Sequence, residues 1–242
     1  MRSGTEPITF VHGFLGLPTD WRSLARAGVD TAVDLWSIIE SKEFAISADA
    51  FQFASEKMLS ALPSGQKSLL VGYSLGARLA MHALLLRPER FSAAVFISGH
   101  PGLPSETERQ ARVLSDSEWA TRFRSESWTD LMTAWNEQSV LRPVGESVIS
   151  RAERDFDRGT LARALECWSL GRQRDLRPNL TSIRVPILLL TGAADKKFTA
   201  LNAEWIRSLG PGHIQHRVVA GAGHRVPWEQ PQNFIEAMQG FC

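Results

Sequence analysis

The sequence predicts an α/β fold with a mostly parallel central sheet flanked by helices and a helical cap inserted over the carboxyl edge of the sheet. Three observations predict it. Short, continuous apolar runs rich in β-branched residues recur along the chain, as in strands buried on both faces of a parallel sheet. Segments with helical periodicity lie between these runs. One long stretch, residues 101–180, interrupts the alternation.

Six apolar runs are expected to form strands: Ile8–Val11, Val33–Ile39, Ser68–Val71, Ala93–Ile97, Ile187–Leu190 and His216–Val219. Three segments are expected to form helices: Ala48–Leu62, Leu75–Leu86 and Leu201–Leu209. Residues 101–180 are rich in charge and tryptophan, with helical periodicity and no strand pattern. We therefore expect a core of residues 1–100 and 181–242 and a cap of residues 101–180.

The composition narrows the possible functions. A chain of 242 residues that is 43% hydrophobic is long enough for one core, and 27 basic against 26 acidic residues leave no overall field for nucleic acid. No signal peptide and no membrane-spanning stretch is predicted, so we expect a cytoplasmic protein without membrane insertion. Cys167 and Cys242 are interpreted as free thiols. Neither a metal nor an organic cofactor is expected, and the oligomeric state is left open.

The pentapeptide Gly72-Tyr73-Ser74-Leu75-Gly76 fits the pattern G-x-S-x-G between an expected strand and an expected helix. A serine on such a sharp turn has a strained backbone, and glycines two residues away on each side avoid collisions. The turn exposes the Ser74 hydroxyl at the helix N-terminus. The alternative is an ordinary glycine-rich turn with a capping serine, which the flanking strand and helix disfavour.

A serine hydroxyl needs an imidazole and a carboxylate to become reactive. Asp195 follows the strand PILLLTG, and His224 lies in the glycine loop VVAGAGHRV after the next strand. The order Ser74, Asp195, His224 is that of serine enzymes with this strand–turn–helix motif, and all three follow strands. Alone, Asp195 would be interpreted as a helix cap and His224 as a solvated loop histidine.

The backbone amides of Phe14 and Leu75 are expected to form an oxyanion hole. Phe14 follows His12-Gly13 after the first strand, and Leu75 follows the serine. The remaining histidines are assigned no catalytic role: His12 shapes its loop, His82 packs, His100 could line the pocket mouth, and His213 and His216 are undecided.

Over its whole length the chain resembles the α/β-hydrolase superfamily. Within it, the chain resembles the 2-succinyl-6-hydroxy-2,4-cyclohexadiene-1-carboxylate synthases of menaquinone (vitamin K2) biosynthesis. The resemblance rests on FVHGFLGLPTDW, VGYSLGARLAM, SGHPGL with RQARVLSD and WATRF, the TAW segment, TLARALECWSLGRQRDLRPNL, TGAADKKF and GAGHRVPWEQP.

The resemblance implies a carbon–oxygen lyase that acts on a small polycarboxylate. The substrate would be 2-succinyl-5-enolpyruvyl-6-hydroxy-3-cyclohexene-1-carboxylate. Ser74, with His224 and Asp195, would remove a proton next to the ketone of the succinyl group, and electron flow through the ring would expel pyruvate. The amides of Phe14 and Leu75 would stabilise the enolate oxygen.

The resemblance also implies three arginines that bind substrate carboxylates, and arginine suits this task because of its forked donors. Arg78, one helical turn after Ser74, and Arg112 match their motifs without gaps. Arg154 is assigned as the third, although Arg151 or Arg158 could be the equivalent. Most cap arginines would otherwise be solvated charges.

Two aromatic residues are further substrate-binding candidates. Tyr73, the only tyrosine, precedes Ser74 and could orient substrate through its hydroxyl. Trp135 matches an aromatic residue of the family's cap and could wall the pocket, although a helical tryptophan more often simply packs. The chain departs from relatives at Ala77, where a glycine is frequent, and at Leu141, where some have an aromatic residue.

Three other functions are compatible with parts of the pattern. An esterase or thioesterase would use Ser74 as a nucleophile but needs no group of arginines. A carbon–carbon bond hydrolase of ring-cleavage products also binds acidic substrates, but the HGFLG and HPGL segments favour the synthase. A catalytically inactive hydrolase used as a binding module is disfavoured because all three triad candidates are present.

Overall fold

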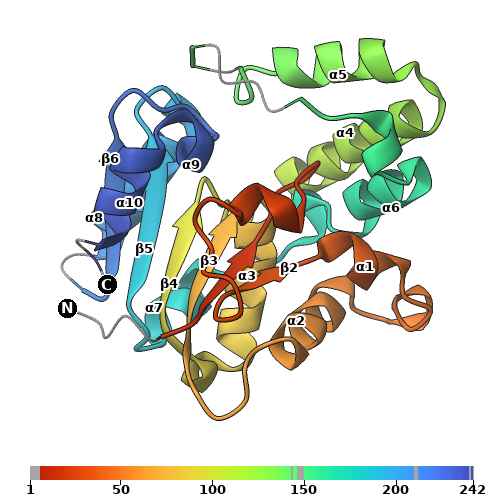
Figure 1. The fold of residues 1–242 in the computed structure, drawn as a ribbon. Coiled ribbons are helices and arrows are strands. Elements are labelled where there is room, and N and C mark those ends of the chain that lie inside the picture. Colours follow the sequence, from red (N-terminus) through yellow and green to blue (C-terminus); the bar gives the residue numbers. More distant parts are fainter. Residues whose placement is uncertain (1–5, 143, 146–149, 210–211, 240, 242) are drawn as a thin grey trace.

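A six-stranded parallel sheet forms the centre of the protein (Figure 1). The computed structural model describes residues 6–142, 144–145, 150–209, 212–239 and 241. The strand order is β2-β1-β3-β4-β5-β6, and each neighbouring pair is parallel. The strands are β1 Ile8–Val11, β2 Thr31–Val33, β3 Ser68–Tyr73, β4 Phe91–Ile97, β5 Ile187–Gly192 and β6 Ile214–Val219. The predicted α/β class and parallel sheet are thereby confirmed.

Helices connect the strands and cover both faces of the sheet. The α-helices are α1 Leu35–Glu40, α2 Ala50–Ser60, α3 Leu75–Leu86, α4 Glu106–Ser125, α5 Trp128–Glu137, α6 Arg158–Cys167, α7 Arg177–Ser182, α8 Lys196–Leu209, α9 Val226–Glu229 and α10 Pro231–Gln239. The short 3-10 helices are η1 Pro18–Trp21, η2 Phe44–Ile46, η3 Pro88–Arg90, η4 Glu153–Asp155 and η5 Leu170–Arg172. The three helices expected from the sequence are present, and α8 begins five residues earlier than expected, at Lys196 rather than Leu201.

Side chains alternate between two apolar clusters because successive residues of a strand point to opposite faces. In β3, Leu70 belongs to the cluster that includes α2 and α3. Its neighbour Val71 belongs to the cluster that includes Trp21 of η1 and Phe234 of α10. Both faces of the inner strands are therefore buried, which explains their continuously apolar sequences.

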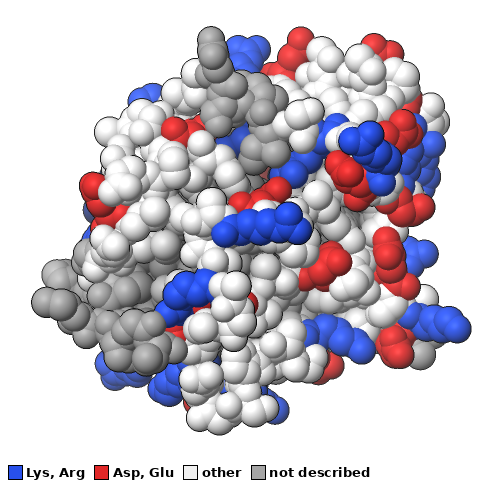
Figure 2. All heavy atoms as spheres, in the orientation of Figure 1, with Lys and Arg blue, Asp and Glu red and all other residues white. Residues whose placement is uncertain are grey.

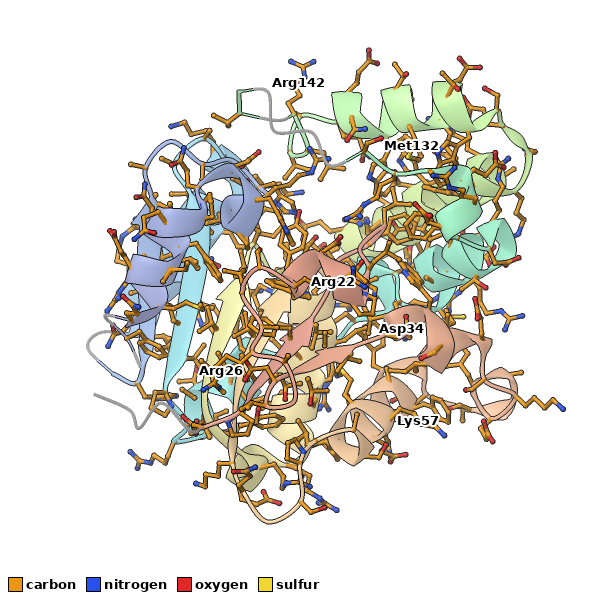
Figure 3. The ribbon with its side chains drawn as sticks, viewed as in Figure 1. Arg22, Arg26, Asp34, Lys57, Met132 and Arg142 are labelled. Atoms are coloured by element: carbon orange, nitrogen blue, oxygen red, sulfur yellow. The ribbon has the colours of Figure 1, made fainter. Side chains whose placement is uncertain are left out.

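The prediction of a strand over Val33–Ile39 is wrong beyond its first residue. The β2 strand ends at Val33, and the Asp34 carboxylate accepts hydrogen bonds from the amides of Trp36 and Ser37, at 3.0 and 3.4 Å. Asp34 thus caps α1 and turns the chain, as Figure 3 shows at the start of that helix. The apolar residues after it are buried at helical spacing.

The chain between β4 and β5 forms a helical insertion. The described residues of the range 101–180 contain helices and no strand, as the sequence predicts. Figure 1 shows α4, α5 and α6 together at the upper right, with α5 farthest from the sheet. Since α6 also packs on α1, and α7 on α3, the exact division at residues 100 and 181 stays a prediction.

The parallel arrangement brings all catalytic candidates to one edge of the sheet. Ser74 follows β3, Asp195 follows β5 and His224 follows β6. Phe14 lies in the loop after β1, which is the neighbour of β3 in the sheet. This common edge also faces the cavities described below.

We predict that Gly76→Ala strongly destabilises the protein. A Cβ at Gly76 would lie 2.3 Å from the carbonyl oxygen of His12 and 2.4 Å from that of Val11, and backbone atoms cannot rotate away. We expect a loss of about 3 kcal/mol in the free energy of unfolding, measured with urea. Gly212→Ala is the control because nothing lies within 4 Å of its Cβ position. Equal stability of the two variants would contradict the prediction.

Candidate active site

Ser74 occupies a strained turn between β3 and α3. Its φ is 52° and its ψ is −112°, in the left-handed half of the map that non-glycine residues rarely adopt. A Cβ at Gly72 would lie 2.7 Å from the Cα of Ala77, and Gly76 has no room either. The glycines therefore have the steric role that the sequence predicts: they allow α3 to approach β3 and β1 closely.

Ser74, His224 and Asp195 form a connected chain of hydrogen bonds. The Ser74 hydroxyl lies 3.2 Å from Nε2 of His224, and Nδ1 of His224 lies 2.7 Å from a carboxylate oxygen of Asp195. The other oxygen of Asp195 accepts the amide of Phe198, so the carboxylate also caps α8. Asp195 and His224 are each only 4% exposed. This is the geometry by which a histidine can accept the proton of a serine.

The amides of Phe14 and Leu75 lie beside the serine and have no hydrogen-bond partner within the described residues. Leu75 begins α3, where backbone amides lack helical partners. The Phe14 loop is held by His12, which is fully buried. Its Nδ1 donates to the Gly13 carbonyl and its Nε2 accepts the Leu35 amide, so His12 shapes its loop as predicted.

Two cavities open beside Ser74, with volumes of about 430 and 520 Å³. Four residues line both cavities: Phe14, Ser74, Trp135 and Leu141. The smaller one, here called the Arg151 lobe, is also lined by Asp20, Tyr73, Met132, Asn136, Arg151, Arg225 and Trp228, among others. The larger one, the Arg78 lobe, is also lined by Leu75, Arg78, Ser98, His100, Arg112, Asp116, Trp168 and Lys197, among others. Figure 3 shows Met132 on the side of α5 that faces the sheet.

Arg78 is buried and held by two hydrogen bonds. Its Nε donates to the side-chain oxygen of Gln173 at 2.8 Å, and its Nη2 donates to the carbonyl of Trp168 at 2.8 Å. Gln173 is fully buried and also donates to the His100 carbonyl. Burial, followed by the charge of Arg112, lowers the pKa of Arg78 to about 9, so the guanidinium stays charged at neutral pH. Its Nη1 has no protein partner within the described residues.

Arg112 lines the same lobe from α4. Its Nε donates to Asp116 at 2.8 Å, and the second carboxylate oxygen of Asp116 accepts the hydroxyl of Ser169 at 2.7 Å. Asp116 is only 4% exposed, whereas the Arg112 side chain is 38% exposed. The carboxylate therefore fixes the stem of Arg112 and leaves its outer nitrogens toward the lobe.

Arg151, rather than Arg154, lies at the cavity. Arg151 lines its lobe and makes a two-pronged ion pair with Asp20, at 2.6 and 2.9 Å. Arg154 is exposed and is absent from the lining of both lobes. Arg158 donates to the carbonyls of Phe123 and Glu126 and pairs with Glu153, so it stabilises the insertion. Of the three arginines that the sequence leaves open, Arg151 is the one that lines a cavity, which makes it a better candidate than Arg154 for binding a substrate.

Tyr73 and Trp135 both line the cavities beside Ser74, and their roles toward a substrate stay predictions. Tyr73 lines the Arg151 lobe, packs against Trp228 with ring centroids 4.8 Å apart, and burial raises the pKa of its hydroxyl well above the usual range. Trp135 lines both lobes and packs on Phe14 at 4.9 Å between ring centroids. Leu141, the departure noted in the sequence, also lines both lobes.

Sequence reasoning missed the residues that hold the His224 loop. The Ser98 hydroxyl donates to the His224 carbonyl at 3.1 Å. Arg225 donates to the Leu141 carbonyl and to the side-chain oxygen of Asn136, at 3.0 and 2.6 Å. The carboxylate of Glu229 accepts the Gly223 amide at 2.6 Å. Glu229 belongs to the segment GAGHRVPWEQP, whose pattern predicts no role for this residue. The loop of His224 is thus tied to the helical insertion.

The other histidines lie outside the triad. His100 lines the Arg78 lobe, its Nδ1 accepts the Gly102 amide, and burial lowers its pKa to about 3. His82 stacks on Phe51, as packing predicts. His213 lies 3.3 Å from the Leu180 carbonyl, and His216 lies 2.8 Å from the Thr191 hydroxyl.

The described residues contain no group of three or more metal-ligating side chains and no helix that could span a membrane. Figure 2 shows basic and acidic side chains interspersed on one face, in keeping with the balanced charge of the sequence. Cys167 is a half-buried free thiol, and Cys242 lies outside the described residues.

Comparison with known proteins supports the likeness noted from the sequence. The model of the alpha/beta hydrolase family matches residues 10–237. The 2-succinyl-6-hydroxy-2,4-cyclohexadiene-1-carboxylate synthase of Citrobacter koseri is 34% identical over 245 residues, covering 97% of this chain and 93% of that protein. The protein of the same name from Escherichia fergusonii is 35% identical, covering 98% and 94%.

Among solved structures, MenH from S. aureus has the same fold. It superposes with a TM-score of 0.80 at 19% identity, over 99% of this chain and 94% of that one. The sequence match over nearly the whole length and the shared fold lead to one conclusion. The chain belongs to the α/β-hydrolase family and, within it, to the 2-succinyl-6-hydroxy-2,4-cyclohexadiene-1-carboxylate synthases.

Proposed function

We propose that this chain catalyses a step of menaquinone biosynthesis, the elimination of pyruvate from 2-succinyl-5-enolpyruvyl-6-hydroxy-3-cyclohexene-1-carboxylate. The observation that carries the proposal is the position of Ser74 between two lobes that are both lined by cations. Arg78 and Arg112 line one lobe, and Arg151 and Arg225 line the other. A substrate with three carboxylates has charge to place on both sides of the serine. Sequence relatives named for the product of this reaction support the proposal.

The change in double bonds defines the reaction. The substrate has its ring double bond at carbon 3, and the product has two, at carbons 2 and 4. A proton therefore leaves carbon 2, which is next to the succinyl ketone, and the bond from carbon 5 to the enolpyruvyl oxygen breaks. The electron pair of the carbon–hydrogen bond ends in the new double bonds and on the departing oxygen. The enolate of pyruvate then takes up one proton, which balances the reaction.

Ser74 serves as the base in this mechanism. Its hydroxyl gives its proton to Nε2 of His224, and the serine oxygen takes the proton of carbon 2. Asp195 holds the imidazole in the required orientation and stabilises it when it is protonated. The amides of Phe14 and Leu75 stabilise the enolate oxygen that forms on the succinyl ketone. No acyl-enzyme forms in this mechanism.

The arginines bind and orient the substrate. Arg78 is one helical turn from Ser74, so the substrate carboxylate that it binds lies near the reacting carbon. Arg112 takes a second carboxylate in the same lobe, farther from Ser74, and Arg151 takes the third in the other lobe. The Tyr73 hydroxyl is protonated at neutral pH, as tyrosine ordinarily is, and burial raises its pKa further, so it can donate a hydrogen bond to the substrate.

The proposal is tested by pyruvate release from the enzymatically generated intermediate, with a p-nitrophenyl ester in a parallel reaction. We expect pyruvate release well above the background rate without enzyme, and little ester cleavage, because the cationic lobes favour a polycarboxylate. Ester cleavage without pyruvate release would show that Ser74 is the nucleophile of an esterase, and would exclude the lyase assignment.

We predict that Ser74→Ala lowers kcat for pyruvate release about a thousandfold, because the base that removes the proton is lost. The variant should keep the melting temperature of the parent or exceed it. Alanine leaves the packing unchanged, because only a single half-buried hydroxyl is removed. The matched control is Ser115→Ala, another serine that lines the Arg78 lobe, which should change kcat little. Unimpaired turnover of Ser74→Ala would refute the triad assignment.

We also predict that Arg151→Met lowers kcat/KM about tenfold to a hundredfold, whereas Arg154→Met leaves it within about twofold. The first removes a cation from the cavity and the second removes an exposed one. Because Arg151→Met also leaves Asp20 without its partner, the double variant Asp20→Asn/Arg151→Met controls for instability. Recovery of full activity in the double variant would show that Arg151 only neutralises Asp20.

A further inference from the structure

Lys197 is a third cation in the Arg78 lobe. It lines this cavity together with Arg78 and Arg112. Lys197 is two residues after Asp195 in the sequence and is exposed overall. It lies in the first turn of α8, where a positive charge is opposed to the helix dipole, and that turn contains no acidic residue. The helix dipole therefore does not account for a lysine at this position, and the carboxylate whose charge favours its protonated form is Asp195, just before the helix.

The hydrogen bonds of the three cations differ. Arg78 uses two of its nitrogens within the protein, and Arg112 uses its Nε. Within the described residues, Lys197 makes neither a hydrogen bond nor an ion pair. All three donor hydrogens of its amine are free for a ligand.

The charges that line the lobe are unbalanced. Among its described lining residues, Asp116 is the one carboxylate against three cations, and it is already bound to Arg112 and Ser169. Although the residue as a whole is exposed, the part of Lys197 inside the lobe is desolvated, and this lowers its pKa. The charge of Arg112 lowers it further, because two like charges near one another are unfavourable. An anion between them would remove this repulsion.

His100 is a neutral hydrogen-bond donor that lines the Arg78 lobe together with these cations. Nδ1 of His100 accepts the Gly102 amide, so the proton of this neutral ring is on Nε2. Arg78, Arg112 and Lys197 are all close enough to lower the pKa of His100 by their charge. These groups surround a space suited to a carboxylate, which accepts up to four hydrogen bonds.

We propose that Lys197 and Arg112 jointly bind one carboxylate of the substrate at the open end of the Arg78 lobe. Arg78 is thereby left to a second carboxylate nearer Ser74. This inference rests on the proposed function, because it assigns part of the charge of that substrate. It adds a fourth cation to the three arginines that the sequence indicates.

The test compares Lys197→Met, Lys197→Arg and the neighbour control Lys196→Met. Lys196 is exposed and is absent from the lining of the cavities, so its variant should behave as the parent. For pyruvate release we expect Lys197→Met to raise KM about tenfold to a hundredfold with kcat within about twofold. Lys197→Arg should restore most of the affinity because its charge is kept.

An unchanged KM in Lys197→Met would overturn the proposal. So would a fall in kcat at constant KM, because Lys197 would then act on Asp195 and the triad. If the parent protein releases no pyruvate, the proposed function fails, and calorimetric titration with tricarballylate still tests the subsite. Weaker binding only in Lys197→Met would support it. Equal binding in all variants, or none in the parent, would overturn it.

Discussion

The active site depends on one close contact, between Gly76 at the start of α3 and the carbonyl groups that end β1. The missing side chain lets the helix start directly over the end of this strand. The chain can reach that position from β3 only by a sharp turn, which places Ser74 at a φ of 52°. The same contact places the start of α3, with Leu75, beside the chain that leads from β1 into the loop of Phe14. The strained turn at Ser74 and the closeness of α3 to the end of β1 therefore have a single structural cause.

Around this elbow, the protein orients its cations with partners that leave some of their guanidinium hydrogens free. Arg78 is held by Gln173 and a carbonyl, which carry no charge, so its positive charge remains for a ligand. Arg112 and Arg151 are each oriented by a carboxylate that uses part of the guanidinium. Because these protein groups already order the arginine side chains, less conformational entropy is lost when a substrate binds. The burial that lowers the pKa of Arg78 is also what makes an incoming carboxylate favourable there.

The sequence predicted the features that local residues determine. The strands, the elbow and the order of the triad follow from short patterns, and five of the six expected strands form essentially where expected. The exception, Val33–Ile39, failed because a single capping residue, Asp34, outweighs the apolar character of the following residues. The third arginine was ambiguous for a different reason. Its position depends on Asp20, which is 131 residues away, and nothing near Arg151 in the sequence distinguishes it from Arg154. The supports at Ser98 and Gln173 also have distant partners.

The same triad can cleave an ester or remove a proton, so the chemistry is selected by what the site holds opposite Ser74. A carbonyl carbon held against the serine oxygen would be acylated, whereas a carbon-bound proton held there would be transferred. In the proposed function, cations in both lobes would fix the two ends of a polycarboxylate and leave its ring across the serine. Arg225 and Glu229 then link the loop of His224 to residues that line or border these lobes. The loop of His224 and the walls of the cavities are therefore held by one network. In the proposed mechanism, the position of the substrate would then decide between hydrolysis and elimination.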